Sequence, residues 1–203
     1  RRPSAPAVSS FLLAAVLLLS ACATPVGVRR LGPEEANQKI AATVLATGKP
    51  SAATLQILNR SGLAETFRSE PAAALAALHE GMPTASRADR FFALAELSFR
   101  HASQGGGPAY YLAAAVYAYA FLFPREGSGS PDAFDPRLRT AVDLFNRGIA
   151  EGFSEQASRR VVLAAGTYRL PFGELAVQVD PAEFRWGPFR MVDFVDAAEL
   201  DVR

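Results

Sequence analysis

From residue 33 to residue 152, apolar side chains recur three or four positions apart, which is the spacing of one helix face. Pro33, followed by two glutamates, suits the start of a first helix, and Gly48 suits its end. Ser51 is placed to cap a second helix. In that second helix the spacing turns two leucines inward, Leu55 and Leu58.

Two further helices are predicted before the glycine run at 105–107. Pro71 suits the first turn of a helix at 71–79, with Leu75 and Leu78 on one face. Ser86 and Asp89 resemble a capping box at the start of a helix over 86–103. Three residues of that helix share a face: Phe92, Ala95 and Phe99.

Residues 109–123 contain no charged side chain, and Pro108 suits the start of a helix there. The run is shorter than the roughly 20 apolar residues that span a bilayer. Its alanines allow neighbouring helices to approach closely. We therefore expect a central helix that is buried on most sides, and the alternative is a surface that faces lipid or substrate.

Residues 136–150 form an amphipathic pattern behind Asp135, a candidate cap, and Pro136. The predicted inward stripe consists of Leu138, Ala141, Val142, Phe145 and Ile149. The predicted solvent-facing side consists of Arg137, Arg139, Asp143 and Arg147.

After Gly152 the pattern changes to β-branched and alternating apolar residues. The stretch around Pro171 and Gly173 predicts a strand, a turn and a second strand, and two shorter runs follow. A few strands without a covering helix bury a face poorly. We therefore expect more protein after Arg203, and exposure of Val161, Leu175, Val177, Phe194 and Val195 in its absence.

The predicted fold class is mainly α, with a helical-hairpin part followed by a short β-rich segment that belongs to an incomplete domain. The helices at 86–103 and 108–123 are similar to a tetratricopeptide-type hairpin, although no period repeats along the chain. The predicted divisions are a signal peptide at 1–21, a tether at 22–32, a helical domain at 33–152 and a β-rich segment at 153–203.

The N-terminus carries a secretory signal, with two arginines before the apolar run of residues 11–19. Residues 19–22, Leu-Ser-Ala-Cys, resemble a bacterial lipobox, in which the thiol is acylated and the chain is cut before the cysteine. Cys22 is therefore the candidate lipidation site. Ala23 favours the outer membrane by resemblance to lipoproteins. The alternative is a signal peptide in which the cysteine is incidental.

Composition narrows the classes of partner. The chain has 203 residues and a formal net charge of +1, so its charge predicts no electrostatic binding to nucleic acid. Half of its residues are apolar, which is typical of a protein with a packed core. Its one cysteine cannot form an internal disulfide.

Candidate chemistry is sparse. The two histidines, His79 and His101, lack carboxylates at matched spacing, so structural roles are expected and no metal or cofactor is predicted. The G-S-G-S-P run at 127–131 has glycine where a nucleophile elbow has serine. Glu96 lies among apolar residues and is expected to be a partnered polar group. No catalytic residue is assigned.

Five stretches resemble the N-terminal region of bacterial lipoproteins of the α/β-hydrolase superfamily, from about Pro33 onward. They are FALAELSFRHA, YYLAAAVYAYAFLFP, FDPRLR, DLFNRGIAEGF and LPFGELAVQVDP. The resemblance implies a serine esterase or lipase-like parent protein, whose catalytic triad and oxyanion hole would lie after this chain. No catalytic position is carried over, because those motifs do not occur here.

Two functions follow as expectations. The first is an accessory region of a membrane-anchored serine hydrolase, with the membrane and the downstream hydrolase domain as its partners. The alternative is a non-enzymatic envelope lipoprotein whose helical hairpins bind another protein.

Overall fold

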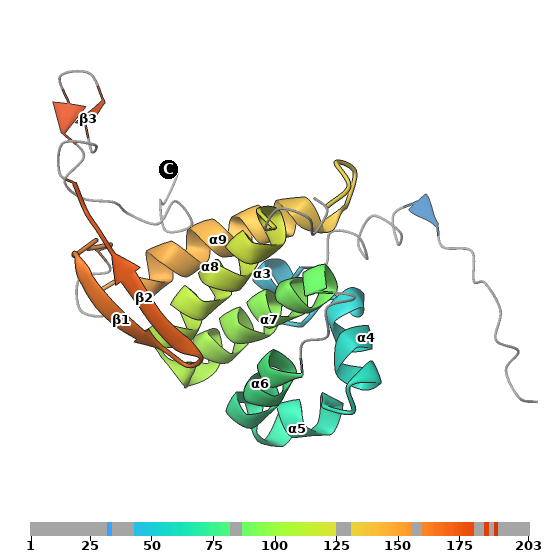
Figure 1. The fold of residues 1–203 in the computed structure, drawn as a ribbon. Helices are drawn as coiled ribbons and strands as arrows, with labels where there is room; N and C mark the ends of the chain where they lie inside the picture. Colours follow the sequence, from blue (N-terminus) through green and yellow to red (C-terminus); the bar gives the residue numbers. More distant parts are fainter. Residues whose placement is uncertain are drawn as a thin grey trace, which may run out of the picture. The chain divides into compact units, whose positions relative to one another are not determined.

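The computed structural model describes residues 32–33, 43–81, 87–124, 131–155, 160–180, 185–186 and 189–190, the last two pairs by their backbone alone. The chain divides into two compact units, Arg1–Asn37 and Gln38–Arg203. All the elements below belong to the second unit. The described part of this unit is mainly helical with two small antiparallel strand pairs after the helices, which confirms the prediction of a mainly α fold (Figure 1).

Among the described residues, four short helices come first: α3 (Val44–Thr47), α4 (Ala52–Arg60), α5 (Ala64–Ser69) and α6 (Pro71–Glu80). Gly48 ends α3 in the left-handed conformation that glycine favours, with φ of 67°. Ser51 caps α4 through a hydrogen bond from the Thr54 amide, as predicted. In α4 the prediction for Leu55 was wrong, because Leu55 is exposed and Ile57 is buried beside Leu58.

Helices α7 (Arg87–His101) and α8 (Pro108–Leu122) form a helix hairpin. They run antiparallel, since Phe99 contacts Tyr111 and Phe92 contacts Phe121. The π-helical turn η2 (Ala102–Gly106) joins them. The predicted face of α7 is confirmed, because Phe92, Ala95 and Phe99 are all buried.

Helix α9 (Arg137–Gly152) packs antiparallel along α8. Gly148 permits this approach, because a Cβ there would lie 2.7 Å from the Tyr111 carbonyl oxygen. The predicted inward stripe was partly wrong: Val142 is exposed, whereas Leu144 is fully buried. The helix meets both α7 and α8, so its buried side is centred on Ala141 and Leu144 and lies away from Val142.

The prediction of a charged, solvated side on α9 was wrong for two of its arginines. Arg137 and Arg147 lie over aromatic rings of the bundle, with guanidinium carbons 5.1 Å from the Phe121 centroid and 5.6 Å from the Phe99 centroid. Long arginine stems cover apolar surface in this way, which a helical pattern alone does not distinguish from full exposure.

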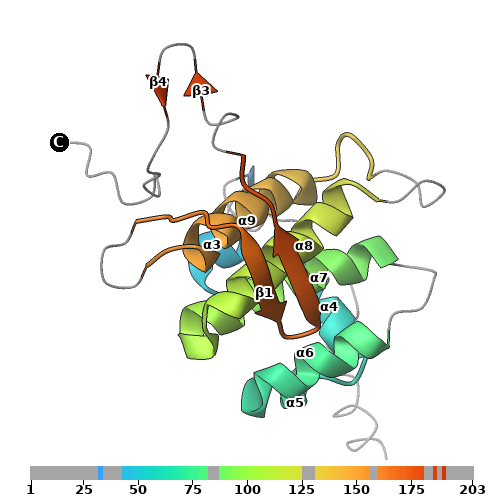
Figure 2. The ribbon, with the colours of Figure 1, turned by 60° about the vertical axis from the view of Figure 1, so that its left-hand side comes forward.

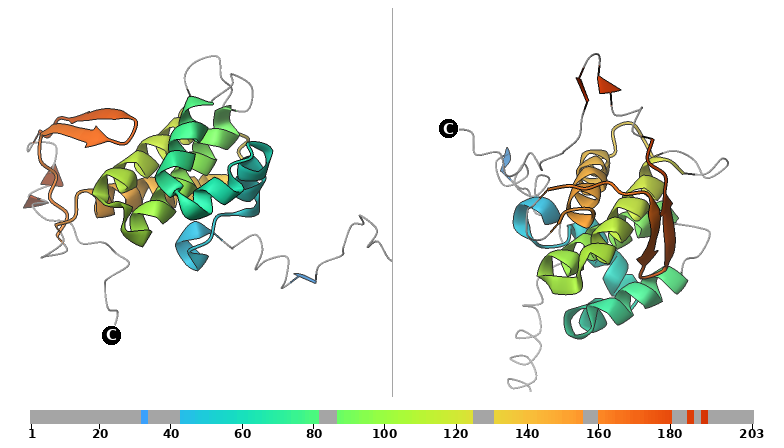
Figure 3. Two further views of the ribbon diagram at one scale, coloured as in Figure 1. Left: turned by 90° about the horizontal axis from the view of Figure 1, so that it is seen from below. Right: turned by 90° about the vertical axis from the view of Figure 1, so that its left-hand side faces the viewer.

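Strands β1 (Gly166–Leu170) and β2 (Gly173–Val177) form the predicted hairpin, and Tyr168 pairs with Leu175. The hairpin packs on α8, as two views show (Figures 2 and 3). Its half-buried face consists of Tyr168, Leu170, Leu175 and Val177, so a helix does cover this sheet. The exposure predicted for Val161 was wrong, since that side chain is 6% exposed. Phe194 and Val195 lie outside the described residues.

Strands β3 (Arg185–Trp186) and β4 (Phe189–Arg190) make a second antiparallel pair. Within the described ranges, no helix is long and apolar enough to cross a bilayer.

Candidate functional site

The predicted lipidation site, Cys22, lies outside the described residues, as do the signal peptide and nearly all of the tether. The anchor therefore stays a prediction from sequence. The described part of the second unit offers two other kinds of candidate, its polar clusters and its exposed apolar surfaces.

His79, at the end of α6, lies in an aromatic cluster. Its Nδ1 lies 2.8 Å from the Tyr117 hydroxyl of α8, and its ring stacks on Phe172 of the hairpin turn at 5.0 Å. Burial raises the pKa of Tyr117, so the phenol keeps its proton. The tautomer of His79 sets which of the two groups donates the hydrogen bond. The histidine thereby ties α6, α8 and the hairpin together.

His101, the last residue of α7, lies against the ring of Tyr110, with centroids 4.4 Å apart. Burial lowers the pKa of His101 and favours its neutral form. Gly106 lies so close beneath the imidazole that a Cβ there would come within 2.7 Å of Cδ2. His79 of α6 contacts Tyr117 and His101 of α7 contacts Tyr110, about two turns apart along α8, so the structure does not bring the two histidines together.

Glu96 of α7 is a fully buried carboxylate. Its Oε2 accepts hydrogen bonds from the Thr54 hydroxyl at 2.6 Å, the Ser51 hydroxyl at 2.7 Å and the Ser51 amide at 3.0 Å. These donors lie at the start of α4, where helix amides favour a negative charge. The prediction of a partnered polar group is confirmed for Oε2, whereas Oε1 is buried and has no hydrogen-bond partner among the described residues. Through Oε2, Glu96 attaches α4 to the centre of α7.

Arg137 is the centre of a second charged cluster, at the end of the bundle where α9 begins. Its guanidinium contacts the Asp135 carboxylate at 2.7 Å and the Asp89 carboxylate at 2.6 Å. The hydrogen bonds from Arg137 lower the pKa of Asp135, and the same contacts raise the pKa of Arg137. Asp135 also accepts the Arg137 amide at 2.9 Å, as predicted for a residue that caps α9.

An open pocket of about 530 Å³ lies beside this cluster and is lined by both carboxylates, Arg60 and Phe134 among others. Its volume is typical of small-molecule sites. Arg137 is already paired with Asp135 and Asp89, so it has little capacity left to bind an anion. We assign no ligand to this pocket.

These polar clusters connect helices of the bundle to one another. Among the described residues, no serine or cysteine lies within hydrogen-bond distance of a histidine, and no group of acidic, histidine or cysteine side chains could hold a metal ion. Each of the two charged clusters instead joins segments distant in sequence, α4 to α7 through Glu96 and α7 to α9 through Arg137.

The strongest candidate for function is an apolar surface on the outer sides of α8 and α9, which we call the α8–α9 face. Tyr119 is 51% exposed, Phe123 62% and Val142 43%. The ring of Tyr119 contacts those of Phe123, at 4.9 Å, and Phe145, at 5.9 Å, so the surface continues across both helices. Val116, one turn before Tyr119, extends it.

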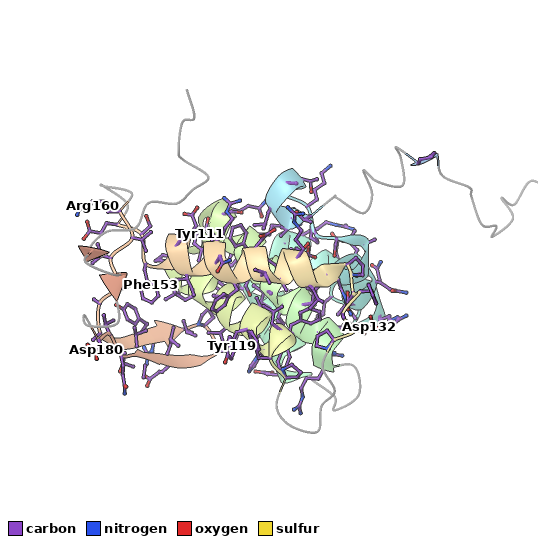
Figure 4. The ribbon with its side chains drawn as sticks, turned by 90° about the horizontal axis from the view of Figure 1, so that it is seen from above. Tyr111, Tyr119, Asp132, Phe153, Arg160 and Asp180 are labelled. Atoms are coloured by element: carbon purple, nitrogen blue, oxygen red, sulfur yellow. The ribbon has the colours of Figure 1, made fainter. Side chains whose placement is uncertain are left out.

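Figure 4 shows Tyr119 on α8, with Asp132 and Phe153 near opposite ends of α9. The prediction that residues 109–123 are buried on most sides is confirmed, since the buried residues surround most of the helix: Ala113, Ala114, Ala115, Tyr117, Ala118 and Phe121. The outer side was foreseen only in the alternative, a surface that faces lipid or substrate, and its residues were not predicted. The helical spacing of Val116, Tyr119 and Phe123, on a side without small residues, was the available signal.

The chain matches no protein-family model, no curated protein and no solved structure. The resemblance to lipoproteins of the α/β-hydrolase superfamily therefore stays a prediction from sequence.

Proposed function

We propose that this chain is the helical accessory region of a lipid-anchored serine hydrolase of the bacterial outer membrane, and that it acts by binding a protein surface. The observation that carries the proposal is the α8–α9 face, where Tyr119 and Phe123 are exposed side by side. Contiguous exposed aromatic side chains are typical of interaction sites, because their burial on contact removes a large apolar area from water.

Three further observations support parts of the proposal. The lipobox at Cys22 supports the anchor, and the resemblance from Pro33 onward supports the hydrolase parent. The use of His79 and Glu96 as ties supports a binding role rather than catalysis for the described bundle. A non-enzymatic lipoprotein that binds a protein partner would use the same face.

The reading frame after Arg203 separates these two functions. We expect it to encode a further domain of roughly 200 residues or more with a G-x-S-x-G elbow on a strand-to-helix turn. A stop codon close to Arg203 would contradict the hydrolase proposal and leave the protein-binding lipoprotein.

The anchor is tested by Cys22→Ser. Acylation needs a thiol, so the variant should lose incorporation of radioactive palmitate and should leave the membrane fraction, whereas the unsubstituted chain should keep both. Undiminished label in the variant would contradict lipidation at this residue.

A further inference from the structure

Charged side chains border the α8–α9 face, and their signs indicate which kind of partner binds there. Arg139 lies one helical turn before Val142, and Asp143 directly follows it. Both charged side chains are exposed, and neither forms an ion pair with another described residue. The apolar surface is thus bordered on α9 by one positive and one negative charge.

A balanced border does not fit a lipid surface. Faces that bind membranes carry an excess of lysine and arginine beside their apolar side chains, because these attract anionic headgroups. Arg139 and Asp143 cancel each other in this respect. The same pair suits a symmetric contact, in which each charge meets its opposite.

The rotation of a two-fold dimer creates that contact. If the axis passes by Val142 and the two α9 helices cross antiparallel, each Val142 meets its own copy. The rotation reverses the helix direction, so Arg139 of one copy approaches the partner's Asp143, and the reverse contact forms at the same time. Two-fold homodimers with such self-complementary surfaces are the commonest protein oligomers.

We propose that the α8–α9 face binds a second copy of this chain, with Val142 at the two-fold axis and Arg139 paired with the partner's Asp143. Tyr119 and Phe123 supply the apolar area beside this centre. The proposal rests on the proposed function, because it identifies the protein surface that the accessory region binds.

The size of the face predicts a weak dimer. The exposed aromatic and β-branched side chains present on the order of 400 Å² per copy, below the roughly 800 Å² per partner of a standard interface. Attachment of both copies to one membrane would raise their effective concentration and favour pairing. The dimer is therefore expected in membranes more than in dilute detergent solution.

Cysteine cross-linking of the full chain in membranes tests the geometry. A residue at a two-fold axis meets itself, so Val142→Cys should give a covalent dimer with a short bis-maleimide. Leu55→Cys is the matched control, because Leu55 on α4 is an apolar side chain of nearly equal exposure, 46% against 43% for Val142. The unsubstituted chain, whose one cysteine is Cys22, sets the background.

Charge reversal then tests the pairing. In the Val142→Cys chain, Arg139→Asp or Asp143→Arg alone should lower the yield of dimer about tenfold, since like charges then meet twice. The double reversal restores opposite charges and should restore the yield. Circular dichroism checks that each variant folds, which is expected because all the substituted side chains are exposed.

Three results would overturn the proposal: a yield at Val142 no higher than at Leu55, single reversals without effect, or a double reversal that does not restore dimer. A Cys22→Ser chain that binds phosphatidylcholine vesicles through Tyr119 and Phe123, without cross-linking at Val142, would identify lipid as the occupant and also overturn it. Failure of the dimer with normal acylation of Cys22 would leave the anchored accessory function standing.

Discussion

The inner and outer sides of α8 are equally free of charge, yet their surroundings are opposite. On the inner side Ala114 and Ala118 are completely buried, and neighbouring helices approach to within contact of the backbone. On the outer side Tyr119 and Phe123 extend into solvent. The inner side also holds the buried rings of Tyr117 and Phe121, so the two sides differ in burial rather than in polarity.

In an uncharged helix, the exposed side chains without a packing role are the candidates for function. Small side chains are needed where another backbone must come close, as α9 does at Gly148. Large rings on the other side have no such packing role among the described residues, so their presence indicates a use outside the core.

The largest effect is expected from a pair of phenylalanines two positions apart. Phe121→Ala should lower the free energy of unfolding by about 3–5 kcal/mol, because Phe121 is 1% exposed, packs on Phe92 and lies beneath Arg137. Phe123→Ala should change it by less than about 0.5 kcal/mol. Urea unfolding followed by circular dichroism measures both changes in free energy. Equal losses for the two variants would contradict the difference in burial between the two sides of α8.

A smaller effect is expected where α9 touches α8. Gly148→Ala should lower the free energy of unfolding by about 1–3 kcal/mol, because its Cβ would lie 2.7 Å from the Tyr111 carbonyl oxygen and the helices would have to separate. Asn146→Ala, on the exposed side of α9, is the control and should be neutral or slightly stabilising, since alanine favours helix. Thermal melting that shows no loss for Gly148→Ala would refute the close contact.

The smallest effect concerns the buried tyrosine of α8. Tyr117→Phe removes the hydrogen bond to His79 and should cost about 0.5–1.5 kcal/mol near pH 7. Tyr119→Phe should cost less, since no hydrogen bond of Tyr119 exists within the described ranges. Chemical unfolding of the two variants at pH 7 compares them directly.

The stability difference between the natural chain and Tyr117→Phe should depend on alkaline pH. Burial raises the pKa of Tyr117 above the ordinary value of about 10, so its stabilising effect is full below that pH and is lost as the pH rises toward the raised pKa. The gap in stability between the natural chain and Tyr117→Phe should therefore shrink above about pH 10. A gap that stays constant would contradict a buried, protonated phenol.

Much of the fold could be predicted because prolines, glycines and capping residues mark where its helices and turns begin and end. Pro71 and Pro108 begin helices, Gly48 ends one, and Pro171 with Phe172 forms the hairpin turn. At these positions the local backbone preference and the final structure agree. Ser51 and Asp135 were recognised as caps for the same reason.

The wrong predictions for α9 share a physical cause. The sequence pattern of one helix does not show which other helices pack against it. Val142 was predicted inward and Leu144 was omitted, because α9 packs on two helices at once and its buried side shifts toward α7. Arg137 was assigned to solvent because the rings beneath it, Phe92 and Phe121, come from other helices. The residues of the α8–α9 face were not predicted for the same reason.

The contact of Phe172 with His79 and Tyr117 also has a consequence for the order of events during synthesis. A chain that becomes available N-terminus first can form α6 and α8 before the hairpin turn. Until Phe172 arrives, that side of the bundle lacks its cover, and the imidazole and phenol meet water. Arrival of the turn then closes the bundle with one aromatic side chain, so a delay before residue 172 would prolong the exposure of this side to chaperones and proteases.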